Sequence, residues 1–179
     1  NGGSIGTPTG IAFDLNAGSA NVTYAGAISN VANALLIDIT GRTGGTVNLS
    51  GNLSSITLGD GINVSSNTGG TINFSGASKT LNTVAATAVT LATNTGATIN
   101  FTNGGLAITT TSGAGFKATG GATALTVQGT GNTISSATGT ALEVTSTTIG
   151  GSGLTFQSIS SNGAASGIVL SSTGSPGGL

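Results

Sequence analysis

The chain carries one eight-residue motif in three copies: TGGTVNLS at 43–50, TGGTINFS at 68–75 and TGATINFT at 95–102. In each copy two apolar residues flank a single asparagine. Because side chains alternate between the two faces of a β-strand, each copy predicts a short strand with its apolar pair inward and its asparagine outward. The preceding glycines predict a tight turn, since glycine adopts positive φ without strain.

The same apolar pattern extends along the chain and alternates with two others at a spacing of about 26 residues, which is typical of stacked repeat architectures. A second set of apolar pairs begins at Phe13, Ile37, Ile62, Val89, Phe116, Leu142 and Ile168. The pairs of the opening motif begin at Val22, Val47, Ile72, Ile99, Leu125 and Leu154, and the last of them ends at Phe156. A third pattern is a single residue that we expect to point inward, at Ile5, Val31, Ile56, Leu81, Ile108, Ile134 and Ile159.

Three short strands and three turns fit one repeat, so each repeat predicts one coil of an all-β solenoid. We expect a right-handed parallel β-helix with three sheets and roughly six and a half coils of about 26 residues. No capping repeat is recognisable at either end of the sequence. We therefore expect residues 1–179 to be a single β-solenoid segment of a longer repeat protein, continued by further coils of the chain or by other copies end to end.

Composition excludes several functions. Three cationic residues and a formal net charge of −1 do not provide the basic surface that phosphate-driven nucleic-acid binding requires. No apolar run approaches the ~20 residues of a membrane-spanning helix. Histidine and cysteine are both absent, which removes disulfides, most nucleophile–base pairs and most transition-metal sites. We expect no cofactor and no catalytic residue.

The predicted second sheet presents a regular outward surface of threonine and asparagine. Stacked asparagine amides can bond to one another along a parallel stack and strengthen it. A flat array of threonine and asparagine also resembles the ice-binding faces of some solenoids, and it could bind a polysaccharide. The candidate binding residues on this Thr/Asn face are Thr46, Asn48, Thr71, Asn73, Thr98 and Asn100.

Asp14 and Asp38 each lie between the members of an inward pair, so they should stack outward on adjacent coils. Carboxyl groups about 5 Å apart are typical of retaining glycosidases, and they could also bridge Ca²⁺ together with Asn63. No aromatic or basic cluster accompanies them for sugar binding, apart from Arg42 in the following turn. We therefore favour an exposed pair without catalytic function.

Further along the same column, Lys117 and Glu143 should form an exposed ion pair. The segment 76–80 superficially resembles a phosphate-binding loop. Ser78 stands where that loop requires glycine before the lysine, so this reading is rejected.

Residues 141–174, ALEVTSTTIGGSGLTFQSISSNGAASGIVLSSTG, resemble the repeats of very large bacterial extracellular proteins with right-handed parallel β-helices, such as haemagglutinin-like adhesins and autotransporter passengers. The resemblance implies a location outside the cell or on its surface and a stalk, adhesive or matrix role. It transfers no catalytic residue. The leading expectation is a non-enzymatic structural or adhesive segment of a long extracellular fibre, with cell-surface or matrix glycans as possible partners. The alternatives are a polysaccharide- or ice-binding solenoid and, more remotely, a carbohydrate-active β-helix enzyme.

Overall fold

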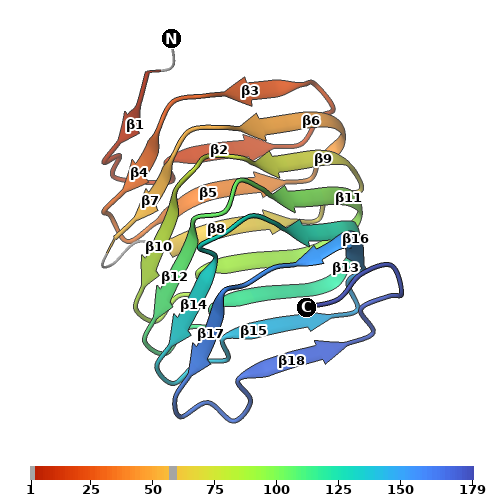
Figure 1. Cartoon of the computed structure of the whole chain (residues 1–179). Coiled ribbons are helices and arrows are strands. Elements are labelled where there is room, and N and C mark those ends of the chain that lie inside the picture. The colour runs from red at the N-terminus through yellow and green to blue at the C-terminus, as the bar shows by residue number, and fades with distance from the viewer. Residues whose placement is uncertain (1–2, 57–59) are drawn as a thin grey trace.

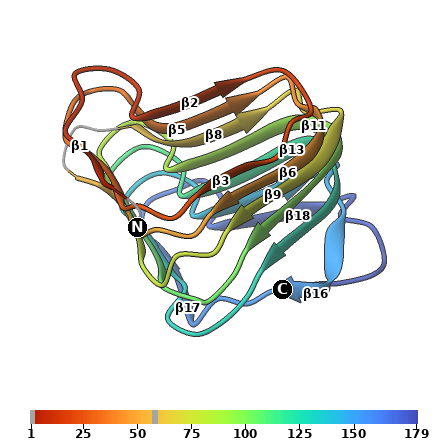
Figure 2. The same ribbon diagram turned by 90° about the horizontal axis from the view of Figure 1, so that it is seen from above.

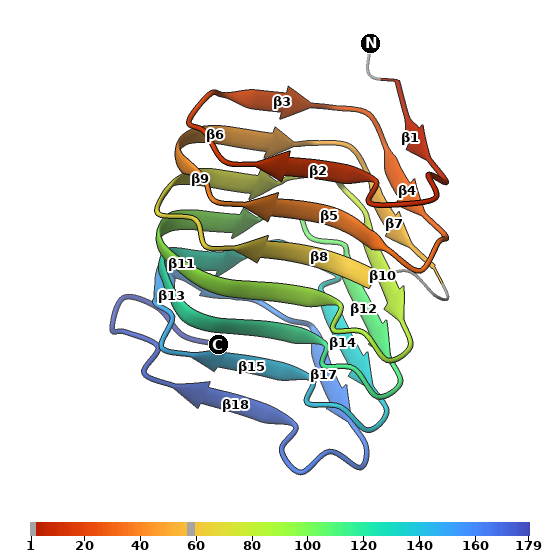
Figure 3. The same cartoon turned by 180° about the vertical axis from the view of Figure 1, so that it is seen from behind.

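The computed structural model describes residues 3–56 and 60–179, and it is built from parallel strands stacked as a β-helix of about six turns with about 26 residues per turn (Figure 1). Every pair of strands for which a register is given runs in parallel. The first coil with β3 lies at one end of the stack, and β18 lies at the other (Figure 3). The predicted fold class is confirmed.

The coils have three faces, which enclose the interior in the view from above (Figure 2). Face 1 contains β2 (Phe13–Asn16), β5 (Leu35–Thr40), β8 (Asp60–Ser65), β15 (Leu142–Thr145) and β18 (Ile168–Ser171). Face 2 contains β3 (Val22–Tyr24), β6 (Thr43–Leu49), β9 (Gly69–Phe74) and β16 (Ile149–Leu154). Two longer strands, β11 (Val89–Phe101) and β13 (Phe116–Val127), pass from face 1 to face 2. Face 3 contains β1 (Ile5–Gly6), β4 (Ile28–Asn30), β7 (Leu53–Ser55), β10 (Lys79–Thr83), β12 (Leu106–Thr110), β14 (Thr133–Ser136) and β17 (Ser158–Ser161).

The core consists of the inward apolar pairs of faces 1 and 2 together with inward residues of face 3 such as Leu81 and Ile108. In the middle coils these residues are fully buried, as Ile37, Ile72 and Leu125 illustrate. Phe74 and Phe101 stack on adjacent coils with ring centroids 4.7 Å apart, as the shared column predicted. The core is therefore a set of columns in which each residue packs on its equivalent one coil away.

The turn from face 1 to face 2, here called corner A, has a left-handed residue at one equivalent position in every coil. Each follows directly after the face-1 segment: Ala17, Gly41, Ser66, Thr93, Gly120, Ser146 and Ser172. The predicted glycine turn lies just beyond this residue. Gly45 and Gly70 have φ of 73° and 94°, and a Cβ at Gly45 would lie 2.1 Å from the Ser19 carbonyl oxygen. The glycines thus permit both the bend and the close stacking of corners.

The prediction for the third column was wrong at Val31 and Ile56, which are 45% and 44% exposed. The strand register pairs Asn30 with Ser55, and Ser55 aligns with Leu81. Because side chains alternate, a shift of one residue moves each of them to the opposite face. Ile5 also belongs to a different column, since it pairs with Ile28.

The prediction for the last pair of face 2 was also wrong. Leu154 pairs with Val127, and Ile149 takes the position opposite Leu125. The four residues Gly150–Gly153 stand opposite the single residue Thr126, and these three extra residues produce a register shift. Phe156 consequently lies beyond the face-2 strand, where its ring meets that of Phe116 edge-on at 6.2 Å.

Candidate functional site

On the Thr/Asn face the asparagines form one hydrogen-bonded ladder. The Asn73 amide donates to Asn48 Oδ1 at 2.7 Å, and the Asn100 amide donates to Asn73 Oδ1 at 2.9 Å. The Thr126 hydroxyl extends the ladder by donating to Asn100 Oδ1 at 2.8 Å. These amides are therefore hydrogen-bonded to the equivalent residues of adjacent coils. This is the structural role expected for stacked asparagines.

The threonines of this face form a second column beside the ladder. Thr46 pairs with Thr71, and Thr71 pairs with Thr98. All three are partly exposed. The six predicted residues thus lie together on one surface, with the asparagines bonded internally and the threonines facing outward.

Asp14 and Asp38 pair directly on β2 and β5, as predicted, and Asn63 of β8 follows in the same column. The Asn63 amide donates to Asp38 Oδ1 at 2.8 Å and to the Ser65 hydroxyl at 3.2 Å. Across residues 3–56 and 60–179, no cluster of three or more histidine, cysteine, aspartate or glutamate residues is placed to hold a metal ion. Further along the column Lys117 Nζ lies 3.0 Å from Glu143 Oε2, so this predicted ion pair is confirmed.

A buried lysine is the first feature that the sequence patterns missed. Lys79 lies inside the turn from face 2 to face 3, here called corner B, and its side chain is 0% exposed between Leu53 and Leu106. Its ammonium group donates to the carbonyl oxygens of Gly76, Thr102 and Gly104 at 2.5, 2.9 and 2.7 Å. Burial lowers the pKa of Lys79 from 10.5 to about 8.

Corner B becomes longer where this lysine appears. Three residues separate Leu49 from Leu53 in one coil, whereas four separate Phe74 from Lys79 in the next. The three carbonyls that accept from Lys79 all belong to the longer corners. Two coils later Asn132 has the same role, and its amide donates to the carbonyls of Gln128, Gly129 and Thr155.

Corner A contains a second buried polar line. The Asn67 amide donates to Asn94 Oδ1 at 2.7 Å, and the backbone N–H of Arg42 donates to Asn67 Oδ1 at 2.7 Å. Arg42 is only 3% exposed, and its guanidinium donates to the carbonyls of Ala17, Ala20 and Gly44. Arg42 thus belongs to the interior and does not accompany the two aspartates as a surface group.

Corner C, the turn from face 3 to face 1, has a polar side chain at the last residue of each face-3 strand from β4 on. These residues are Asn30, Ser55, Thr83, Thr110, Ser136 and Ser161. Asn30 donates to three corner carbonyls, and the Ser55 and Thr83 hydroxyls donate to Asp60 O and Ala86 O. In all six coils the polar residue stands two places after an inward apolar residue, a regularity that could have revealed it.

The burial of two cations changes the surface charge. Arg42 and Lys79 lie inside, so the accessible charges are four carboxylates and the Lys117 ammonium. All five belong to face-1 segments: Asp14, Asp38, Asp60, Lys117 and Glu143. The surface is therefore more acidic than the formal charge of −1 implies, and in the described part of the chain the outward surfaces of faces 2 and 3 carry no charged side chain.

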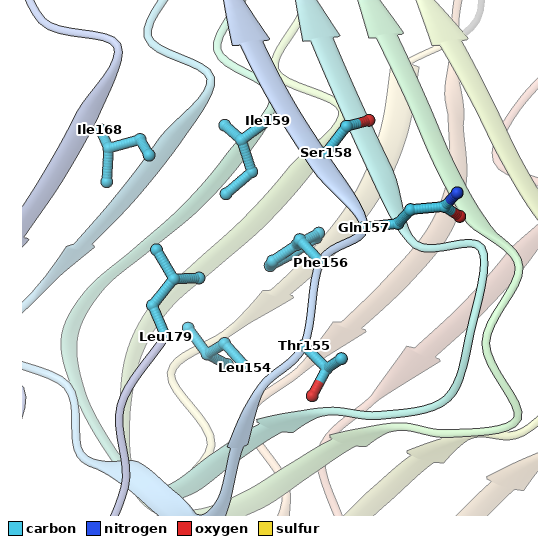
Figure 4. A pocket seen from close by; sticks show the side chains of 8 residues that line it. All are labelled: Leu154, Thr155, Phe156, Gln157, Ser158, Ile159, Ile168 and Leu179. Atoms are coloured by element: carbon cyan, nitrogen blue, oxygen red, sulfur yellow. The ribbon is translucent and has the colours of Figure 1, made fainter.

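A hollow lies at the last coil (Figure 4). It has a volume of about 470 Å³, and its apolar lining consists of Leu154, Phe156, Ile159, Ile168 and Leu179. Ile168 and Leu170, which continue the inward columns of face 1, are 46% and 42% exposed. This end of the structure thus presents apolar core residues and open strand edges.

Comparison of the chain with protein-family profiles, with curated proteins and with solved structures found no match. The part of the chain that the structure describes contains no helix long and apolar enough to cross a membrane.

Proposed function

We propose that residues 1–179 form a segment of a stiff, non-enzymatic rod in a bacterial extracellular or surface-displayed protein, with a structural or adhesive role. The observation that carries this proposal is the continuity of the parallel ladders, in which equivalent residues pair from coil to coil on every face. Columns such as Phe74–Phe101 and Asn48–Asn73–Asn100 resist shear because each residue contacts its equivalent above and below. The extracellular location is supported by the resemblance of residues 141–174 to secreted repeat proteins.

The stacked coils are consistent with end-to-end assembly. The exposed inward residues Ile168 and Leu170 continue the column that begins at Phe13 and Leu15, so the last coil has the register needed to receive another coil. Unpaired strand edges also template further pairing, and a low net charge offers little repulsion. We expect the isolated segment to associate end to end.

Sedimentation velocity over a concentration series, with electron microscopy of the same samples, tests this proposal. Wild-type 1–179 should form linear particles, and Ile168→Glu with Leu170→Glu should shift the population toward monomer. Val31→Glu with Ile56→Glu is the matched control, because those residues are equally exposed but lie on the side of the rod. A monodisperse wild-type monomer at high concentration would contradict the proposal, as would loss of association only in the control.

A carbohydrate-active enzyme is the remote alternative, and its one supporting feature is the pairing of Asp14 with Asp38 on adjacent strands. We assign these residues no catalytic role. The variant Asp14→Asn with Asp38→Asn should keep wild-type assembly and stability. Cleavage of a soluble glycan by the intact segment but not by this variant would overturn the assignment.

A further inference from the structure

The dipeptide Asn-Gly occurs at three places in the chain: Asn1-Gly2, Asn103-Gly104 and Asn162-Gly163. The first lies outside the described residues. The second is in corner B after β11, and the third begins corner C, in the connection from β17 to β18 (Figure 3). An asparagine that precedes glycine is prone to deamidation, because glycine has no Cβ to hinder attack of its backbone nitrogen on the asparagine side chain. The structure makes the two described dipeptides unequal.

At Asn103-Gly104 both groups that would react are hydrogen-bonded. The Asn103 side-chain amide donates to Ser75 O at 2.8 Å, and the Gly104 N–H donates to Gln128 O at 2.9 Å. Gly104 is also tightly enclosed, because a Cβ placed there would lie 2.0 Å from the Thr130 carbonyl oxygen. The Gly104 nitrogen therefore cannot turn toward the Asn103 side chain unless corner B opens.

At Asn162-Gly163 neither group is held. Both residues are exposed, and within residues 3–56 and 60–179 neither the Asn162 side chain nor the Gly163 N–H makes a hydrogen bond. Gly163 has φ of 104°, and a Cβ placed there would lie 3.6 Å from its nearest contact outside the adjoining residues, Thr138. The Gly163 nitrogen thus has room to approach the Asn162 side chain without disturbing the stack.

The unbonded N–H of Gly163 results from a change in how this corner pairs with the preceding coil. In that coil the equivalent residue, Thr138, donates its N–H to Thr111 O at 2.7 Å. The same register would direct the Gly163 N–H to Ala137 O, but the Asn162 N–H bonds to that oxygen at 3.1 Å. Because this acceptor belongs to the preceding coil, the missing bond does not result from the position of Asn162 in the last coil.

We propose that Asn162 is a site of spontaneous deamidation in the folded protein and that Asn103 is protected from it. Hydroxide removes the proton of the Gly163 nitrogen, which then attacks Cγ of Asn162 and closes a five-membered succinimide ring. The Cγ–Nδ2 bond breaks, and the departing nitrogen takes a proton from water and leaves as ammonia, which regenerates the hydroxide. Water then opens the ring on either side of its nitrogen and leaves aspartate or isoaspartate. The net reaction consumes water and exchanges the amide for a carboxylate.

The product changes the surface beside face 3. Asn162 follows directly after β17, and in the described part of the chain the outward surface of face 3 carries no charged side chain. Each reacted chain therefore gains a negative charge on a neutral side of the rod. Isoaspartate also adds a carbon atom to the main chain between β17 and β18. This modification goes beyond the structural role proposed above and does not depend on it.

The experiment follows both asparagines in one sample of 1–179, which is incubated at mildly alkaline pH, then unfolded and digested with trypsin. Cleavage after Lys79 and Lys117 places Asn103 in peptide 80–117 and Asn162 in peptide 118–179. Mass spectrometry with fragmentation locates each amide that has become an acid, and isoaspartyl methyltransferase labels the isoaspartate. In the folded protein Asn162 should react at least about tenfold faster than Asn103, since Asn103 reacts only when corner B opens. In urea at the same pH the two rates should become similar, because the dipeptide is the same.

Gly163→Ala is the test variant, and it should slow the reaction of Asn162 at least severalfold in both the folded and the unfolded chain. Gly167→Ala, in the same connection but not next to an asparagine, is the matched control and should keep the wild-type rate. The proposal is overturned if Asn162 stays intact in the folded protein while the unfolded chain reacts, or if Asn103 reacts as fast as Asn162 in the folded protein. Equal rates at Asn162 in the wild type and in Gly163→Ala would likewise contradict it. The readout is the mass of digested peptides, so it is separate from the sedimentation test of end-to-end association.

Discussion

The ring of Phe74 lies on the ring of Phe101 with centroids 4.7 Å apart and planes 18° from parallel. Phe101 in turn meets Phe116 edge-on at 5.6 Å. Offset-stacked and edge-to-face pairs contribute about 0.5–1.5 kcal/mol beyond the burial of their area. The middle of the rod is thus held by a run of aromatic contacts across neighbouring coils.

Replacing Phe101 tests this run. Phe101→Leu should lower the free energy of unfolding by about 1–3 kcal/mol, because it removes both ring contacts and leaves space in a fully buried column. Phe101→Asp should unfold the middle of the rod. Phe13→Leu, in the partly exposed first coil, is the control and should cost less in urea unfolding. Equal losses at the two positions would argue against the stacked column.

Lys79 should make stability depend on alkaline pH. The folded-state pKa of about 8 lies below the ordinary value of 10.5, so between these values the unfolded chain binds more protons. Stability should therefore rise with pH from about 8 to 10.5, by on the order of 3 kcal/mol. Urea unfolding at several pH values should show this rise in the wild type and not in Lys79→Met. A rise of the same size in the variant would exclude Lys79 as its source.

The asparagine ladder predicts a distinct cost at its centre. Asn73 both donates to Asn48 and accepts from Asn100, so Asn73→Ala breaks two hydrogen bonds. The expected loss is about 1–3 kcal/mol, since partly buried amide groups are left without partners. Thr71→Ala, two residues earlier on the same strand and the same face, should change stability by less than about 0.5 kcal/mol. Thermal or urea unfolding of the two variants separates the ladder from general surface effects.

Corner A offers a stabilising substitution. Thr93 has φ of 56°, a left-handed conformation that is costly for a β-branched residue. Asparagine tolerates this conformation, so Thr93→Asn should raise the free energy of unfolding by about 0.5–1 kcal/mol. Thr95→Asn, exposed two residues later without positive φ, should give no such gain. A loss at Thr93 with no change at Thr95 would contradict the strain argument.

Several features were predictable because they depend on periodicity. The alternation of apolar residues at a period of about 26 predicted the parallel β-helix, the stacked pair Phe74–Phe101 and the register of Asp14 with Asp38. The same register predicted the ion pair between Lys117 and Glu143. These outcomes follow from sequence alone because, in a parallel stack, equal spacing along the chain becomes contact between equivalent residues.

The errors occurred where a turn changes length or a strand shifts by one residue. Val31 and Ile56 were assigned inward because they are apolar, but the carbonyls of corner C required polar donors inside, and Asn30 and Ser55 supply them. Leu154 was misaligned because three extra residues precede it. Side chains alternate between the two faces of a strand, so a shift of one residue moves each inward side chain to the solvent-facing side.

What the sequence by itself determined is the architecture: the repeat, the three faces and the columns of the core. What only the tertiary structure decided is where the polar and charged residues lie. Arg42 and Lys79 are cations, and cationic side chains ordinarily lie on the surface. Here both are buried, because they donate hydrogen bonds to corner carbonyls of neighbouring coils. Those acceptors come from residues about one coil away along the chain, so no local pattern reveals them. Their burial leaves face 1 acidic and faces 2 and 3 neutral, because the direction of a side chain depends on the backbone groups that the stacked coils bring around it.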